Sequence, residues 1–574
     1  MDYKKLAEIY QSLENTSKRL EKIELLSNFL KNIPKEDSEV LYLLLGNIYA
    51  AYDDRKIGIS NQLTIKAISI SIGINKENTI NEWKKIGDLG EVVEKLVKIK
   101  SQSTLHKTNL TIKKVLDNLR KLPDLEGKGT VNKKINFITE LLTSASPLEA
   151  KYIVRTLLGD LRMGVQESTL RNSIANAFFE DKKEASKTIQ RAFDNSNDSA
   201  VVFEIAKKGR LKNFEQISIT VGKPIKAMLA QKTESIEQGF KDLGKPCVIE
   251  FKYDGFRLII HKDDSEKLTL FTRSLENVTK QFPEVVDYLK KYVKGKSFIL
   301  DSEAVGYDKK TKKYTPFQSI SQRIRRKYDI GILQKKLPIE INVFDILYYN
   351  GKSFLDEPFK KRTKLLRKIV KNYPYKIAVS KQIITSDVKK AKEFYKKALK
   401  QNQEGIMMKK LDAEYKPGRR VGHMLKIKPA EQDLDLVITG AEYGTGKRSG
   451  WLTSFILSCK NSKSGEYLEV GKVSTGLKEK KSDEENSLSY GELSEKLKPL
   501  IIKEKGKTVT IKPKIIVSVT YQEIQKSPNY NSGIALRFPR FTALREDKPL
   551  SEINTIKEIE EELMNQKKEN YKYG

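Results

Sequence analysis

Cysteine and histidine are scarce in this chain of 574 residues, which has two cysteines, Cys247 and Cys459, and three histidines. Two cysteines so far apart in sequence exclude a disulfide framework and a four-cysteine zinc site. His106, His261 and His423 are too few and too scattered to predict a histidine-metal site. The lack of cysteine fits a reducing compartment, so we expect a cytoplasmic, nucleoid-associated protein.

Long apolar runs are missing as well. No stretch approaches the roughly 18 apolar residues of a membrane-spanning helix, and no signal segment with a hydrophobic core is evident at the start. Acidic residues are the minority, 75 against 108 Lys and Arg, which leaves a formal net charge of +33. This excess favours a polyanionic partner, nucleic acid first and an anionic membrane second.

The chain is long enough for about three or four domains, and its residue pattern changes twice. Residues 1–221 carry apolar side chains at helical spacing and predict an all-α domain. Residues 222–430 alternate short apolar strands with helical stretches and predict an α+β domain. Residues 431–574 are dominated by strands and predict a small β-barrel that ends in a charged helix.

The most informative stretch is Glu250-Phe251-Lys252-Tyr253-Asp254-Gly255, which contains the pattern Lys-x-Asp-Gly. Alternation along this predicted strand places Glu250 and Lys252 on one face. A turn at Asp254-Gly255 follows, so Lys252 stands at a strand end. A lysine must lose a proton before it can attack a phosphate, and burial and neighbouring positive charge favour that loss.

Further stretches follow in a fixed order at plausible spacing. They are Phe271–Asn277, Leu300–Val305, Phe344–Gly351, Glu404–Lys409, Leu425–Pro429 and, near the C-terminus, Leu536–Phe541. With Lys-x-Asp-Gly, they resemble the ordered motifs of covalent nucleotidyltransferases, specifically ATP-dependent DNA ligases of the archaeal and eukaryotic replicative type. Leu158–Val165 resembles that family's helical DNA-binding domain, and Val470–Gly476 resembles its barrel.

The resemblance implies a multidomain fold: an all-α N-terminal DNA-binding domain, an α+β nucleotidyltransferase (adenylation) domain and a C-terminal OB-fold β-barrel. It implies that Lys252 takes AMP from ATP and passes it to the 5′-phosphate at a nick in duplex DNA, which is then sealed. It also implies roles in replication, repair and recombination.

Roles for individual residues follow from the same resemblance. Lys252 would be the nucleophile, Glu250 would accept a hydrogen bond from the adenine amino group, and Phe344 would stack on the purine. Other residues would bind ribose, phosphates or Mg²⁺, with Mn²⁺ as the alternative metal: Arg257, Arg273 and Arg420 for ribose and phosphate, Glu303 and Glu404 for ribose or metal, Lys426 and Lys428 for the transferring phosphate.

Three further residues have two interpretations each. Asp254 would shape the turn after Lys252, or act directly. Arg537 and Arg540 would orient the leaving pyrophosphate, or form a basic turn that faces DNA.

Alternatives remain at this stage. An mRNA guanylyltransferase or an RNA ligase shares the lysine chemistry, although the long basic helical region argues against both. The lack of a zinc-cysteine cluster disfavours an NAD-dependent ligase. A duplex-coating protein without catalysis is the non-enzyme alternative. We expect a monomer. A sliding clamp is expected as a partner only because clamp binding is common in the family that the chain resembles; no glutamine-led aromatic clamp-binding motif is evident in the sequence.

Overall fold

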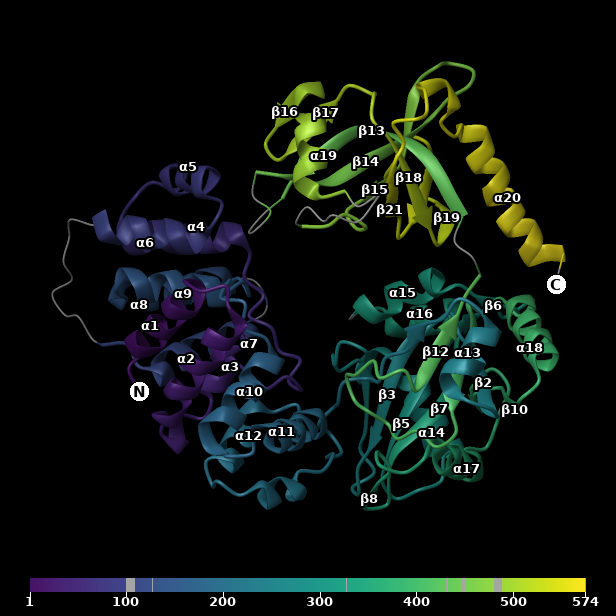
Figure 1. The fold of residues 1–574 in the computed structure, drawn as a ribbon, viewed down its shortest axis with the longest axis horizontal. Helices are drawn as coiled ribbons and strands as arrows, with labels where there is room; N and C mark the ends of the chain where they lie inside the picture. Colours follow the sequence, from purple (N-terminus) through teal and green to yellow (C-terminus); the bar gives the residue numbers. More distant parts are fainter. Residues whose placement is uncertain are drawn as a thin grey trace. The chain divides into compact units, whose positions relative to one another are not determined.

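The computed structural model describes residues 1–99, 109–125, 127, 129–326, 328–429, 432–444, 448, 450–479 and 488–572. The chain divides into two compact units, Met1–Ile427 and Lys428–Gly574. The helical region and the first strand-containing region therefore belong to one unit. Figure 1 draws the helical region in purple to blue and the first strand-containing region in teal to green. No helix among the described residues combines the length and apolar character needed to cross a membrane.

The N-terminal region is helical, as the sequence predicts. Its helices are α1 (Tyr3–Glu14), α2 (Arg19–Lys31), α3 (Val40–Leu44), α4 (Asn61–Ile72), α5 (Lys76–Ile86), α6 (Leu89–Ile99), α7 (Ile112–Asp124), α8 (Thr130–Ser144), α9 (Pro147–Leu157), α10 (Glu167–Phe178), α11 (Lys182–Ser196) and α12 (Ser199–Ala206).

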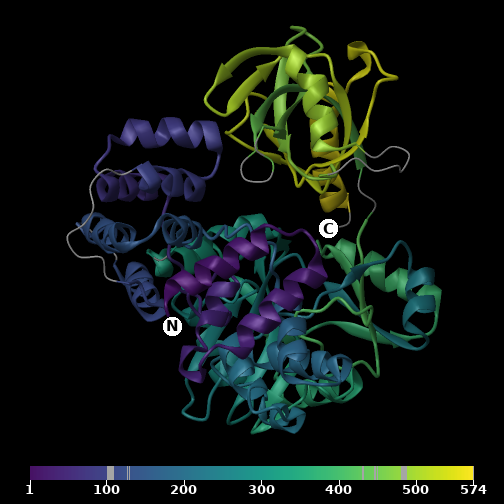
Figure 2. The ribbon, with the colours of Figure 1, turned by 60° about the vertical axis from the view of Figure 1, so that its left-hand side comes forward.

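Local signals explain where helix α9 begins. Ser146 caps α9 and forms a capping box with Glu149, and Pro147 occupies the first turn. Helix α6 packs against α9 and α4 against α8. Figure 2 shows these violet-to-blue helices stacked in layers.

A buried charge cluster ties these helices together. Arg155 on α9 is 2% exposed, and its Nη atoms lie 2.8 Å from both Asp88 and Glu14. Asp88 also pairs with Arg162 at 2.7 Å. Buried charges are tolerated when they are paired in this way. The segment 158–165, which resembles the family's DNA-binding domain, is therefore anchored at Arg162.

Two sheets follow in the same unit. The first has the order β1-β12-β11-β2-β10, with β1 (Gln231–Lys232), β2 (Cys247–Lys252), β10 (Gln382–Thr385), β11 (Gly405–Lys410) and β12 (Met424–Ile427). The second has the order β4-β3-β5-β7-β8, with β6 on β5 and β9 on β7. Its strands are β3 (Phe256–Lys262), β4 (Leu268–Thr272), β5 (Phe298–Tyr307), β6 (Tyr314–Thr315), β7 (Ile339–Tyr349), β8 (Lys352–Ser353) and β9 (Ile377–Val379).

The described residues of this region also form the helices α13 (Ile236–Leu243), α14 (Pro283–Tyr292), α15 (Phe317–Arg325), α16 (Ile330–Lys336), α17 (Phe359–Ile369) and α18 (Val388–Lys400). Strand β2 continues through the turn at Asp254 into β3, so it links the two sheets. The predicted alternation along β2 is confirmed. Ile249 and Phe251 pack in a core cluster with Phe394, whereas Glu250 and Lys252 stand on the face that borders a cavity.

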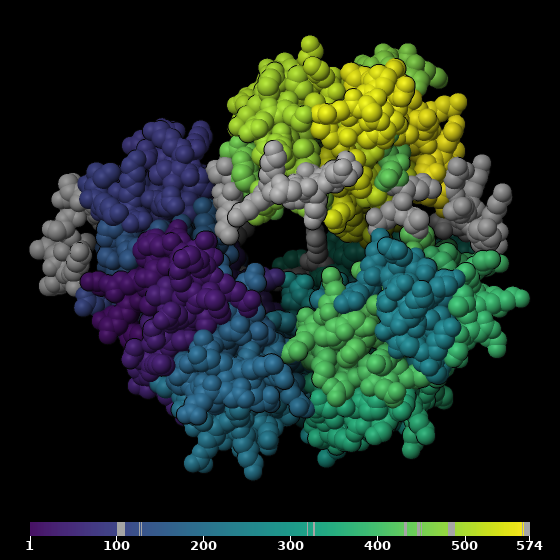
Figure 3. Space-filling view, in the orientation of Figure 1, coloured from purple at the N-terminus to yellow at the C-terminus, as the bar shows by residue number. Residues whose placement is uncertain are grey.

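The second unit has its own core and its own sheets, and Figure 3 shows its surface in green to yellow. The strand order of the larger sheet is β15-β14-β13-β17-β16, and β18 joins β13 to β21. The strands of this sheet are β13 (Gln432–Tyr443), β14 (Leu452–Lys460), β15 (Tyr467–Val473), β16 (Ile501–Lys505), β17 (Thr508–Ile511), β18 (Ile516–Tyr521) and β21 (Arg540–Leu544). Strands β19 (Glu523–Lys526) and β20 (Ile534–Arg537) pair with each other in a separate two-stranded sheet, and the unit also has helices α19 (Tyr490–Leu497) and α20 (Ile556–Lys572). The predicted strand-rich domain with a C-terminal helix is confirmed.

His261 on β3 makes stability depend on pH. Its side chain is 1% exposed, and its Nδ1 accepts a hydrogen bond of 2.9 Å from the Gly222 N–H. Burial lowers the pKa of His261 to about 3. The unfolded chain, with an ordinary histidine pKa near 6.5, binds a proton below that pH that the folded protein excludes. The contribution of His261 to the free energy of unfolding is therefore fully present above about pH 6.5. It is lost progressively as the pH falls from there toward 3.

We expect His261→Asn, which keeps an acceptor for Gly222 and does not titrate, to reduce this dependence. Between pH 7 and 5 the wild type should lose about 2 kcal/mol more of its unfolding free energy than the variant. Urea unfolding at the two pH values measures the difference. Equal losses in both proteins would contradict the interpretation.

Candidate active site

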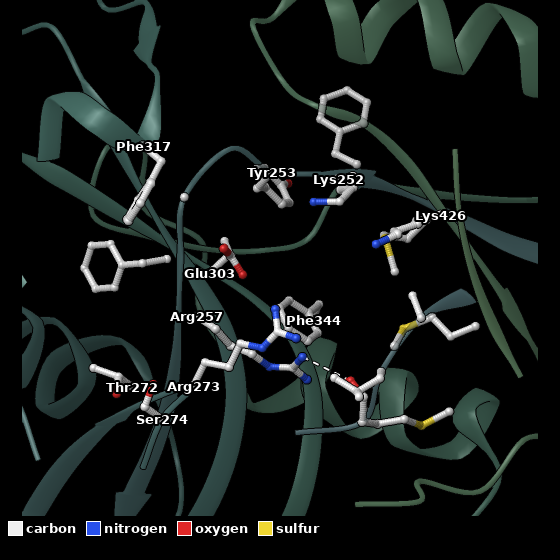
Figure 4. A pocket seen from close by; sticks show the side chains of 18 of the residues that line it. Lys252, Tyr253, Arg257, Thr272, Arg273, Ser274, Glu303, Phe317, Phe344 and Lys426 are labelled. Atoms are coloured by element: carbon white, nitrogen blue, oxygen red, sulfur yellow. Dashed lines mark hydrogen bonds between the residues drawn. The ribbon is translucent and has the colours of Figure 1, made fainter. Parts of the chain in front are cut away.

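A cavity of about 960 Å³ opens in the first unit, between the strand ends of its two sheets. Eight of the residues assigned from sequence line it: Glu250, Lys252, Arg257, Arg273, Glu303, Phe344, Arg420 and Lys426. Figure 4 shows Lys252, Arg257, Arg273, Glu303 and Lys426 pointing into this space. Residues more than 170 positions apart in sequence thus share one site.

Lys252 ends β2, and its surroundings hold it in place. Its carbonyl accepts a hydrogen bond of 2.9 Å from the Glu404 N–H, and its Nζ lies 2.6 Å from Glu404 Oε2. The Lys252 side chain is 21% exposed, so a ligand in the cavity can reach it. The turn that follows is held where the Asp254 N–H donates to Gln403 Oε1 at 3.2 Å.

Glu250 is buried beside Lys252 on the same strand face. It is 2% exposed, and its Oε2 lies 2.6 Å from Nζ of Lys409 on the neighbouring strand β11. Burial raises the pKa of Glu250, and Lys409 opposes that rise. A buried carboxylate at the cavity wall is suited to accepting a hydrogen bond from a donor group of a ligand.

Arg257 and Phe344 form another part of the cavity wall. Arg257 is held by Asp301, to which its Nε donates at 2.7 Å, and it also donates to the Met228 carbonyl and to the Tyr415 hydroxyl. Its guanidinium lies 5.3 Å from the centre of the Phe344 ring. The aromatic ring and the fixed guanidinium together offer a stacking surface and a phosphate- or ribose-binding group.

Glu303 and Glu404 are the candidate metal ligands. Burial raises the pKa of Glu303 to about 7; Lys252 and Arg257 act against this rise, and Glu404 and Asp301 add to it. Burial thus disfavours the ionised form of Glu303, and a cation bound beside it would favour that form. Carboxylate oxygens suit Mg²⁺, which takes its remaining ligands from water and phosphates. No cluster of three or more metal-ligating side chains occurs in the part of the chain that the structure describes.

The remaining predicted residues fall into two groups. Arg273 and Arg420 are exposed at the cavity wall, where a ligand can meet them. Lys428, Arg537 and Arg540 belong to the second unit, so their roles stay predictions. There, Arg537 ends β20 and pairs with Glu523 at 3.2 Å, and Arg540 is exposed at the start of β21.

Sequence reasoning missed several contributors. Asp301 and Lys409 lie inside quoted motifs, so their position was a signal, but their ion-pair partners were not visible. Phe317 at the start of α15 and Tyr415 in the loop after β11 carried no motif signal. Tyr415 donates to Asp301 at 2.8 Å and so braces Arg257 indirectly.

A strand-end lysine in such a cavity, with a buried carboxylate, an aromatic ring and several cations, defines a covalent nucleotidyltransferase site. Residues 227–428 match the family described as "ATP dependent DNA ligase domain", residues 2–175 match "DNA ligase N terminus", and residues 448–548 match "ATP dependent DNA ligase C terminal region". The chain therefore belongs to the ATP-dependent DNA ligase family, and its C-terminal domain is that family's OB-fold.

Individual relatives are similar in sequence to this chain over nearly its full length. The chain is 45% identical to a DNA ligase of Nanoarchaeum equitans and 41% identical to one of Thermococcus fumicolans, in each case over 98% of both chains. Among solved structures, it resembles "Pmar-Lig_PreS3" with a TM-score of 0.56 and 18% identity, over 94% of this chain and 99% of the other. That structural likeness bears on the fold alone.

Proposed function

We propose that this protein seals nicks in duplex DNA through an AMP carried on Lys252. The observation that supports this most directly is the position of Lys252, at a strand end inside a cavity that also holds Glu250, Phe344 and Arg257. The family membership fits the same function, in replication, repair and recombination.

The proposed division of the chain into domains is residues 1–221, 222–430 and 431–574.

The proposed reaction has three transfers. The Lys252 amine loses a proton and attacks the α-phosphorus of ATP; a P–N bond forms, the bond to the β-phosphate oxygen breaks, and pyrophosphate leaves. An oxygen of the 5′-phosphate at the nick then attacks the same phosphorus, and the lysine amine is released. The 3′-hydroxyl finally attacks the activated 5′-phosphate, loses its proton and expels AMP.

Other residues would bind the groups that change charge. Lys426 and Lys428 would stabilise the transferring phosphate, and Arg273 and Arg420 would hold ribose or phosphates. Arg537 and Arg540 would orient pyrophosphate.

Glu303 and Glu404 would hold Mg²⁺, or Mn²⁺, which neutralises phosphate charge when bound. The raised pKa of the buried Glu303 fits this assignment, because a bound cation would favour its ionised form.

Nicked duplex DNA is the proposed partner, bound mainly through its phosphates by a monomer in the cytoplasm. The excess of 108 basic over 75 acidic residues supports this. We expect affinity for a nicked duplex to fall about 10³-fold or more between roughly 50 and 200 mM salt, with little difference between unrelated sequences. Anisotropy titrations measure both. A flat salt dependence would contradict phosphate-dominated binding.

Incubation with α-labelled ATP and Mg²⁺, followed by a nicked duplex, tests the function. Label on the protein that chases into sealed DNA supports it. Label that does not chase, or label from GTP instead of ATP, indicates RNA or cap chemistry. No label from ATP, GTP or NAD overturns the enzyme and leaves a DNA-binding protein.

A further inference from the structure

A second lysine of the cavity is buried and has no part in the proposed transfers. Lys409 on β11 is 6% exposed, and its Nζ lies 2.6 Å from Glu250 Oε2. Lysine is almost never buried so completely unless it is paired. Burying such a pair costs solvation that its attraction barely offsets. A buried pair at the wall of a binding cavity therefore points to a role in binding.

Lys409 also contacts the aromatic wall. Its Nζ lies 4.9 Å from the centre of the Phe344 ring and 4.6 Å from that of Phe359, the first residue of α17. One ammonium group thus meets both the carboxylate that would read the edge of a base and the ring that would stack on its face. Both contacts are short enough for cation–π attraction.

The strand register accounts for this geometry. Strands β2 and β11 are antiparallel, with Met407 opposite Glu250. Lys409 lies two residues further along β11, so it shares the face of Glu250 and reaches it diagonally. Lys410, the next residue, points to the opposite face and is exposed. The chain therefore offers a neighbouring lysine outside the cavity as a matched control.

The charge state of Glu250 depends on this partner. Burial raises the pKa of Glu250, Lys409 is the largest influence against the rise, Asp345 adds to the rise, and Arg367 also opposes it. An ionised carboxylate only accepts hydrogen bonds, whereas a protonated one also donates through its O–H. Loss of Lys409 would therefore shift Glu250 toward the form that donates.

The two forms of Glu250 suit different purines. Adenine presents an amino group at C6, which donates; guanine and hypoxanthine present an oxygen there, which accepts. We propose that Lys409 sets the preference for adenine over 6-oxopurines, by keeping the Glu250 carboxylate an acceptor and by holding Phe344 next to it. This inference rests on the proposed function, in which Glu250 and Phe344 bind the base of ATP.

The test compares labelling of the protein by α-labelled ATP and α-labelled ITP from pH 6 to 8, in the wild type and in single variants. Lys409→Met and Lys409→Gln should lose preference for ATP over ITP by about 10- to 100-fold, the value of one buried polar recognition contact. The loss should grow as the pH falls, because protonation of Glu250 then favours ITP. Lys409→Arg keeps the charge and should keep the preference, as should Lys410→Met.

Several outcomes would overturn the proposal. One is a Lys409→Met or Lys409→Gln protein with the preference and pH profile of the wild type. Another is an equal loss with both nucleotides, which a merely structural lysine would cause. If circular dichroism shows that these variants do not fold, the pH dependence of the wild type tests the proposal instead. The ITP labelling of the wild type should stay a constant small fraction of its ATP labelling from pH 6 to 8. A rise of that fraction toward pH 6 overturns the proposal. A wild type labelled by neither nucleotide refutes the proposed function instead.

Discussion

Lys252→Ala is expected to abolish labelling of the protein by ATP, with a loss of sealing on the order of 10⁴-fold or more, as when a catalytic nucleophile is removed. Among the described residues that line the cavity, the other two lysines are Lys409, which is paired with Glu250, and Lys426. Lys426 lines the same cavity but lies on β12, two strands away from β2 in the sheet. Labelling with α-labelled ATP and gel analysis of nicked DNA measure the two effects.

A matched substrate separates lost chemistry from lost folding. A nick whose 5′-phosphate already carries AMP needs no lysine nucleophile, because only the attack of the 3′-hydroxyl remains. Lys252→Ala should therefore still seal this substrate at a rate closer to that of the wild type. A variant that labels as well as the wild type would place the nucleophile elsewhere.

Gly255→Ala is expected to have the second-largest effect, because the turn after Lys252 has no room for a side chain. A Cβ at position 255 would lie 2.2 Å from the carbonyl oxygen of Ala304 and 3.0 Å from Cγ of Glu303. Ala304 belongs to β5, which is held between β3 and β7 and cannot easily move. The turn would have to shift instead, taking Lys252 with it.

We expect this variant to lose about 1–3 kcal/mol of stability through overpacking. Its labelling by ATP should fall about 10²-fold, because a displacement near 1 Å suffices to spoil the alignment of a nucleophile. Gly331→Ala is the control: it lies on α16 with nothing within 4 Å of its new Cβ. That control should label normally and be as stable as the wild type or slightly more so. Normal labelling by Gly255→Ala would show that the turn can relax.

The fold class and the strand that carries Lys252 could be predicted from the sequence because the signals for them are local. Alternation along Val248–Tyr253 assigned Glu250 and Lys252 to one strand face, and the structure confirms it. The helical spacing before Gly222 and the strand-rich pattern after residue 431 predicted the fold class correctly. These features depend on neighbours a few residues apart, where backbone geometry and side-chain pattern leave few choices.

The tertiary structure alone decided which side chains meet. Lys409 reaches Glu250 across a strand pair, although the two residues are 159 positions apart in sequence, and only the register of that pair puts them on a diagonal. Tyr415 and Asp301 brace Arg257 in the same long-range way. A motif identifies the type of residue that a reaction needs. Burial and pairing across strands determine the charge state and the orientation of that residue, and both arise only when distant segments pack together.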